Sequence, residues 1–100
     1  MSDKALILVD VQKCFLSGGS LEVKEGDQVV PVLNRYIELF KRLGLPIYAT
    51  RDWHPSVTKH FKDYGGLWPA HCVQGTEEAE FADELDLPED TEIISAGTAL

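Results

Sequence analysis

The sequence is poor in positive charge. It has 9 Lys and Arg against 17 Asp and Glu, which gives a formal net charge of -8 at pH 7. Nucleic acids and anionic membrane surfaces bind clustered basic residues, so this balance argues against both kinds of partner. The acidic side chains concentrate in residues 75–90, "GTEEAEFADELDLPED", a pattern typical of a solvated helix face and turn. The charge favours a small neutral or cationic substrate.

Long hydrophobic runs and a cysteine framework are also missing. No apolar stretch approaches the ~20 residues that cross a bilayer. The opening "MSDKALILVD" has too short an apolar run, and an aspartate too early, for a signal peptide, so a cytoplasmic protein is expected. In that compartment the 2 cysteines predict no disulfide. We expect Cys14 to be a wall or loop residue and Cys72 a packed thiol.

What the sequence does contain is an alternation of strands and helices. Apolar runs at residues 5–10, 45–52 and 91–95 predict three strands, the first of them buried on both faces. A long helix is expected between the first two strands, and a short helix over residues 77–85 before the third. This order is typical of parallel strands joined by crossovers, and it predicts a single α/β domain over residues 1–100.

The long helix is predicted over residues 27–44 from apolar side chains at helical spacing. Asp27 is the expected N-cap and Gly44 the expected C-cap, while Pro31 falls in the first turn, where its missing N–H is tolerated. The apolar positions are Val29, Val30, Leu33, Ile37, Phe40 and Leu43.

Chemically capable side chains follow the predicted strands. Because ligands of open parallel sheets gather outside the carboxyl ends of the strands, these residues are expected on one edge of the sheet. The loop 51–73, "RDWHPSVTKHFKDYGGLWPAHCV", adds all 3 histidines and both tryptophans of the chain. The residues at the strand ends are Asp10, Asp52, His54, Ser95 and Ala96.

Asp52 and His54, two positions apart, leave the same face of an extended chain, and His71 returns at the far end of the loop. One carboxylate and two imidazoles suit Zn, Fe or Mn and leave positions open for water or substrate. Spacing alone also allows surface histidines, with Asp52 capping a turn. His60 is expected to face solvent, and Cys72 to point away from the metal.

Three further positions allow both a functional and a structural interpretation. Asp10 either accepts backbone hydrogen bonds or, partly desolvated, is tuned for proton transfer. Gln12 either orients a polar substrate group or bonds to neighbouring backbone. The aromatic residues Phe15, Trp53 and Trp68 are either core or lid packing, or the walls of a site for a flat aromatic ligand.

Three strings carry a resemblance to a known family. "ALILVDVQKCFLSGGSLEV", "IYATRDWHP" and "GGLWPAHCVQGT", in this order and spacing, resemble the nicotinamidase/pyrazinamidase branch of the isochorismatase-like cysteine hydrolases. The resemblance implies a three-layer α/β/α fold around a mostly parallel sheet. This chain would provide its first half, about three strands and two helices. It also implies hydrolysis of nicotinamide, and of pyrazinamide, to the acid and ammonia.

The resemblance also implies residue roles. Asp10 matches the aspartate of the family's Asp, Lys and Cys triad. The family's metal ligands fall on Asp52, His54 and His71, with zinc the first choice and Fe or Mn possible, and the metal holds the pyridine ring nitrogen. Pocket positions fall on the aromatic residues Phe15 and Trp68. Gln12 is a further candidate substrate contact from its own place after the first strand, not from the resemblance.

The sequence departs from the family pattern at the catalytic residues. The family's "SKGT" reads "SAGT" here, so Ala96 stands at the position of the catalytic lysine. Neither Cys14, which replaces a family aspartate, nor Cys72 matches the nucleophilic cysteine. We therefore expect a nicotinamidase-like amidohydrolase half with little activity alone. The alternative is a metal- and ligand-binding module without chemistry. A third possibility is that a second chain, as a complementing C-terminal half or in a homo-oligomer, supplies the missing strands, lysine and cysteine. Such pairing would also cover the exposed apolar edge of a half sheet.

Overall fold

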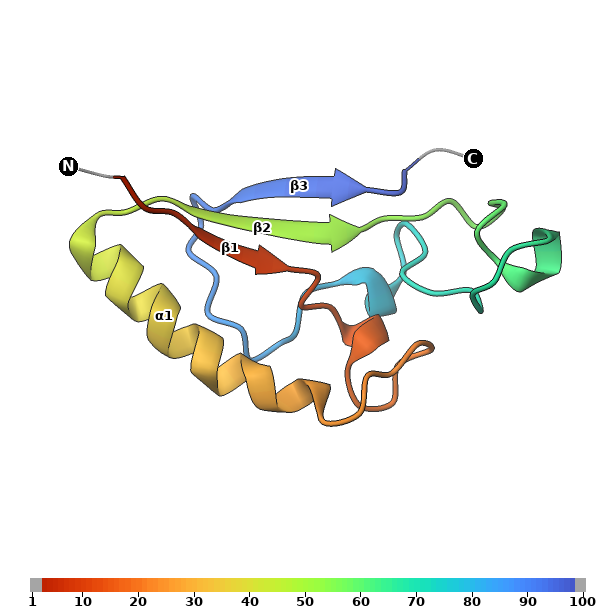
Figure 1. Ribbon diagram of the computed structural model, residues 1–100, viewed down its shortest axis with the longest axis horizontal. Coiled ribbons are helices and arrows are strands. Elements are labelled where there is room, and N and C mark those ends of the chain that lie inside the picture. The colour runs from red at the N-terminus through yellow and green to blue at the C-terminus, as the bar shows by residue number, and fades with distance from the viewer. Residues whose placement is uncertain (1–2, 99–100) are drawn as a thin grey trace.

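A parallel three-stranded sheet forms the centre of the computed structural model, which describes residues 3–98 (Figure 1). β1 (Leu6–Val9) and β3 (Glu92–Ala96) both pair in parallel with β2 (Ile47–Asp52), which lies between them. The α/β class, the parallel sheet and the three strands predicted from the sequence are confirmed.

The long helix α1 (Val29–Leu43) covers one face of this sheet (Figure 1). Val30 and Ile37 of the helix form the core with Leu8 and Ala49 of the strands, and Leu33 and Phe40 pack against it. Val29 and Leu43, which the helical spacing also assigned to the apolar face, are exposed. Gly44 ends the helix in the left-handed region, at φ 69°, as predicted. The N-cap prediction is wrong: a 3-10 turn, Gly26–Gln28, precedes the helix, and Asp27 instead accepts a hydrogen bond from the Ser17 N–H at 2.8 Å.

The predicted second helix, residues 77–85, does not form. Within it the structure has one 3-10 turn, Glu77–Ala79, and the chain then runs extended beside the first loop. The backbone N–H of Ala82 donates to Val11 at 3.0 Å, and that of Lys13 donates to Glu80 at 3.0 Å. Tertiary pairing with the first loop thus overrides the local helical pattern, because it satisfies the same backbone groups.

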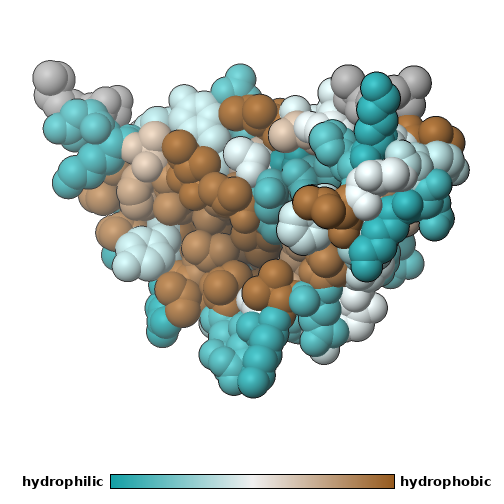
Figure 2. Space-filling model, turned by 45° about the vertical axis from the view of Figure 1, so that its right-hand side comes forward, coloured by the Kyte–Doolittle hydropathy of each residue, from teal (hydrophilic) through white to brown (hydrophobic). Residues whose placement is uncertain are grey.

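β1 is not buried on both faces, as its unbroken apolar run predicted. Leu8 is 1% exposed under α1, but Ile7 and Val9 on the opposite face are 59% and 66% exposed. In the described residues no helix covers that face. Figure 2 shows apolar side chains gathered in a continuous area of the surface. No helix of residues 3–98 is long and apolar enough to span a membrane.

All three strands point the same way, so their carboxyl ends share one edge of the sheet (Figure 1). The loops that follow β1 and β2 both extend beyond this edge. Asp52 stands opposite Ala96 in the register of β2 and β3, and the Asp10 N–H donates to Thr50 of β2. The sheet therefore brings the chemically capable residues of distant segments to one place.

Candidate metal centre and adjoining cavity

Asp52, His54 and His71 converge at this edge, as the sequence predicted. Each offers one ligand atom, and these atoms lie within 4.8 Å of one another. Asp52 is the last residue of β2, and His54 follows in extended backbone. The far end of the loop returns to His54 through two hydrogen bonds: the His54 N–H donates to Cys72 at 2.9 Å, and the Gln74 N–H donates to His54 at 2.7 Å. Both histidines are buried.

The two imidazole rings have their orientation and tautomer set by backbone carbonyls. Nδ1 of His54 lies 2.9 Å from the Gly97 oxygen, and Nδ1 of His71 lies 2.8 Å from the Pro69 oxygen. A carbonyl oxygen can only accept, so each Nδ1 carries a hydrogen, and in the neutral imidazole, the form that binds a metal ion, each Nε2 keeps a free lone pair. Metal-bound histidines commonly have such a partner on the second ring nitrogen.

Both free Nε2 atoms face one carboxylate oxygen. Oδ2 of Asp52 is 3.5 Å from Nε2 of His54 and 3.8 Å from Nε2 of His71. Lone pairs that face an anionic oxygen repel it, and a cation between them reverses that repulsion. Two ligand atoms ~2.1 Å from one ion at the tetrahedral angle lie ~3.4 Å apart, close to the 3.5 and 3.8 Å that separate Oδ2 of Asp52 from the two Nε2 atoms. The residues therefore fit a divalent metal ion.

Gln12 holds the backbone of Asp52. Its side chain is 0% exposed, and its amide nitrogen donates to the backbone oxygens of Asp52 and Ala79, both at 2.8 Å. Its amide oxygen accepts the Asp52 N–H at 2.9 Å. The sequence left two roles open for Gln12, a substrate contact or hydrogen bonds to backbone. The structure shows hydrogen bonds to backbone, and they use both hydrogens of the Gln12 amide.

Asp10 occupies left-handed backbone, at φ 55°, directly after β1. Its Oδ1 accepts a hydrogen bond from the Thr50 hydroxyl at 2.8 Å. Burial raises the pKa of its carboxyl above the ordinary value, and the neighbouring Asp52 charge adds to this, while the Thr50 bond and His54 act in the opposite direction. The partial desolvation expected from its place at the end of an apolar strand is present.

A cavity of about 460 Å³ opens beside the three candidate ligands. It brings together most of the predicted site, because Asp10, Phe15 and Trp68 line it with the ligand set. Gln12 and Trp53 are not among its lining residues. The Arg51 guanidinium lies over the Trp53 ring, 3.8 Å from its centroid. The lining residues are Asp10, Phe15, Leu21, Asp52, His54, His60, Trp68, His71 and Gly97.

His60 is exposed, as the sequence analysis expected. It also lines the cavity, which was not expected, and its ring centroid lies 5.9 Å from that of His54. The available signal was its membership in the histidine-rich loop.

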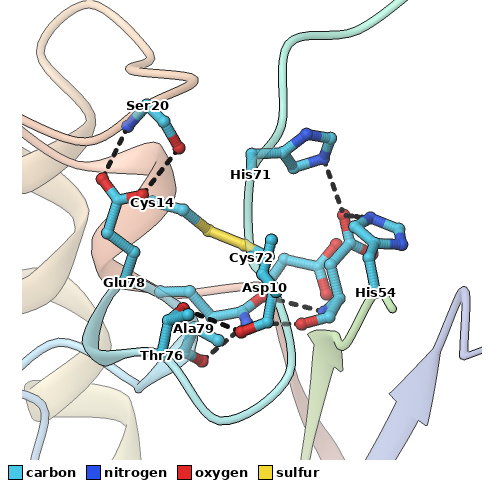
Figure 3. Close-up of a disulfide and its surroundings, with 12 residues drawn as sticks. Asp10, Cys14, Ser20, His54, His71, Cys72, Thr76, Glu78 and Ala79 are labelled. Carbon is cyan, nitrogen blue, oxygen red and sulfur yellow. Dashed lines mark hydrogen bonds and ion pairs between the residues drawn. A yellow bond between two sulfur atoms is a disulfide. The ribbon is translucent and has the colours of Figure 1, made fainter. Parts of the chain in front are cut away.

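The two cysteines form a disulfide, contrary to the prediction of a loop residue and a packed thiol. Figure 3 shows Cys14, from the turn after β1, bonded to Cys72 of the returning loop. Their Cα atoms lie 5.6 Å apart although 58 residues separate them in sequence. The prediction relied on the usual rarity of disulfides in cytosolic proteins and could not include this proximity, which the parallel pairing of β1 and β2 creates.

Fold and site together define the class of protein. The sequence matches the Isochorismatase domain family over residues 4–96, and the chain belongs to that family. The curated relatives that it matches are nicotinamidases or nicotinamidase/pyrazinamidases. The nicotinamidase of Acinetobacter baylyi is 40% identical over 109 residues, covering 93% of this chain and 49% of the relative. The nicotinamidase/pyrazinamidase of Mycobacterium tuberculosis is 40% identical over 86 residues, covering 83% of this chain and 46% of the relative.

Solved structures show the same relationship. The pyrazinamidase of Pyrococcus horikoshii in complex with zinc superposes with a TM-score of 0.91 at 54% sequence identity, covering 95% of this chain and 52% of that chain. A protein of L. infantum in complex with nicotinate superposes with a TM-score of 0.86 at 36% identity, covering 95% and 48%. The chain thus spans about half the length of these relatives and has the fold of about half their domain.

Proposed function

We propose that this chain is the metal- and substrate-holding half of a nicotinamidase-like amidohydrolase, and that residues 1–100 form one α/β unit. The reaction of the complete site is hydrolysis of nicotinamide, or of pyrazinamide, to the acid and ammonia. The observation that carries the proposal is the convergence of Asp52, His54 and His71 on one point beside an aromatic cavity. Relatives solved with zinc and with nicotinate support it.

The ligand set is proposed to hold zinc, with Fe or Mn as alternatives, since two imidazoles and one carboxylate suit all three ions. A bound ion would supply an anchor for the ring nitrogen of a pyridine carboxamide. The chain's own aromatic residues, Phe15 and Trp68, would then pack on the faces of the ring. A neutral heteroaromatic amide also agrees with the acidic charge of the chain, which disfavours polyanions.

Asp10 is proposed as the base of the reaction. An amide is a poor electrophile, and a thiolate divides its hydrolysis into formation and release of a thioester. Asp10 would accept the thiol proton and pass it to the departing ammonia. Its raised pKa suits this role, because a partly desolvated carboxylate holds a proton more readily than one in water.

The catalytic partners of Asp10 must come from another polypeptide segment. Ala96 stands opposite Asp52 where the family has lysine, and both cysteines of this chain are bonded to each other. Loss of the nucleophile in a covalent mechanism leaves activity lower by several orders of magnitude. We therefore propose that the chain alone has little or no amidase activity, and that a complementing half or a second copy completes the sheet.

A second candidate function is binding of metal and ligand without chemistry, which the disulfide favours because it removes both thiols. Two measurements on the purified chain separate the candidates: metal content by elemental analysis and ammonia release from nicotinamide. Bound metal with no ammonia supports a binding half. Turnover near that of ordinary enzymes would refute the proposal that the catalytic site is incomplete. A folded chain that contains no metal would refute the metal centre itself.

A further inference from the structure

The Cys14–Cys72 disulfide joins the two segments that enclose the metal centre. Cys14 lies in the 3-10 turn Lys13–Phe15, next to the cavity residue Phe15, and Cys72 directly follows the ligand His71. Figure 3 shows the bond between the turn after β1 and the loop that carries His71. Both cysteines are 0% exposed and pack with Ala79, Phe15 and Trp53.

His71 depends on such an anchor more than the other two ligands. Asp52 belongs to the central strand, and the ring of His54 is hydrogen-bonded to the backbone carbonyl of Gly97, just beyond β3. His71 lies at the end of a long loop, and its ring is hydrogen-bonded to the carbonyl of Pro69 in the same loop. That bond orients the ring within the loop but does not attach the loop to the sheet.

The backbone after His71 also needs to be held in place. Cys72 has φ 46°, in the left-handed region that residues other than glycine rarely adopt. On one side it is held by the hydrogen bond from His54, and on the other by the disulfide. The rings of Phe15 and Phe61 contact His71 at centroid distances of 5.7 and 5.6 Å, but ring packing of this kind fixes direction weakly.

We propose that the Cys14–Cys72 disulfide is a positioning element of the metal centre, which holds His71 beside Asp52 and thereby raises the affinity for a divalent cation. The inference rests on the proposed metal site. Reduction by a dithiol breaks the S–S bond with two electrons, each sulfur takes one proton, and the dithiol closes to its own disulfide. The loop that carries His71 then moves independently of Phe15, so the affinity for the cation falls.

The test compares zinc affinity in the oxidised parent chain and in the double variant Cys14→Ala/Cys72→Ala, which has no thiol to bind zinc itself. Changes that loosen the groups behind a metal ligand lower affinity by ~10–100-fold, and this is the expected loss. The control is Ile37→Val, which weakens the core under α1 and leaves the centre untouched. Equal zinc affinity in parent and double variant would overturn the proposal.

Hydrogen exchange of the metal-free parent, before and after reduction, provides a readout that requires neither zinc nor a variant. Faster exchange at the amides of His54 and Gln74, with α1 unchanged, is expected if the bond holds the loop locally. Faster exchange throughout α1 as well would mark general stabilisation and overturn the proposal, as would no change. A parent that binds no zinc would defeat the proposed function, while the exchange data still decide whether the disulfide holds the loop.

Discussion

Gln12 and the backbone of Asp52 hold each other in both directions. The Gln12 amide oxygen accepts the Asp52 N–H at 2.9 Å, and the Gln12 amide nitrogen donates to the Asp52 carbonyl at 2.8 Å. The pair resembles one step of a β-ladder, with a side chain in place of a strand. It fixes the end of β2, and so fixes the direction in which the Asp52 carboxylate points.

Replacing Gln12 with alanine is expected to lower both stability and metal affinity. Three backbone groups lose their partner, the buried Ala79 carbonyl and the partly buried N–H and carbonyl of Asp52, and a fully buried group left unpaired costs about 1–3 kcal/mol. Urea denaturation and zinc titration measure the two effects. Gln28→Ala is the control, because the exposed Gln28 makes no side-chain capping bond at the start of α1. An unchanged zinc affinity in a folded Gln12→Ala chain would contradict the supporting role.

His71→Ala is expected to reduce the metal content without unfolding the chain. The imidazole offers one of the three candidate ligand atoms, and the packing around it involves ring contacts rather than strand pairing. Metal content by elemental analysis, with circular dichroism to confirm the fold, checks this. Asp63→Asn, an exposed carboxylate of the same loop, serves as control. A full equivalent of metal in the His71→Ala protein would remove this residue from the ligand set.

Gly97→Ala is expected to displace the His54 ring. A Cβ built on Gly97 lies 2.5 Å from Cε1 and 2.7 Å from Nδ1 of His54, and the residue has φ 65°. Loss of the carbonyl partner on Nδ1 is expected to weaken zinc binding ~10–100-fold. Gly44→Ala is the matched control, with φ 69° but no atom within 4 Å of the added Cβ. Equal losses of zinc affinity in the two variants would attribute the effect to backbone strain instead.

Asp10→Asn is expected to stabilise the metal-free chain at neutral pH. Because burial raises the pKa of Asp10, the folded state binds its proton more tightly than the unfolded state. This contribution is fully present below 3.8, the ordinary value, and is lost as pH rises through the folded pKa. Asparagine keeps an acceptor for Thr50, tolerates left-handed backbone and has no charge to desolvate.

The measurement is urea denaturation of Asp10→Asn and parent in the presence of a chelator, at neutral pH and below pH 3.8. The advantage of the variant should be present at neutral pH and absent in acid. Asp3→Asn, at an exposed aspartate, controls for loss of one negative charge. An advantage of the same size at both pH values would show that desolvation of the carboxylate is not the cause.

The elements with strong local patterns were predictable from the sequence. Val30, Leu33, Ile37 and Phe40 recur at helical spacing and form α1, and the three apolar runs form the strands within a few residues. Residues 77–85 carry a pattern just as suggestive of a helix, yet they pair with the first loop. Nothing local distinguishes the two cases, because the partner backbone of Val11 and Lys13 is more than 60 residues away in sequence.

The sequence by itself determined the order of strands and the main helix, the acidic charge, and the residue types able to hold a metal ion. These follow from periodicity and side-chain chemistry, which are local properties. The tertiary structure alone decided that Cys14 meets Cys72, that Gln12 serves the backbone of Asp52, and that His60 borders the cavity. Each of these depends on a distance between segments far apart in sequence, and the parallel sheet is what makes such distances short.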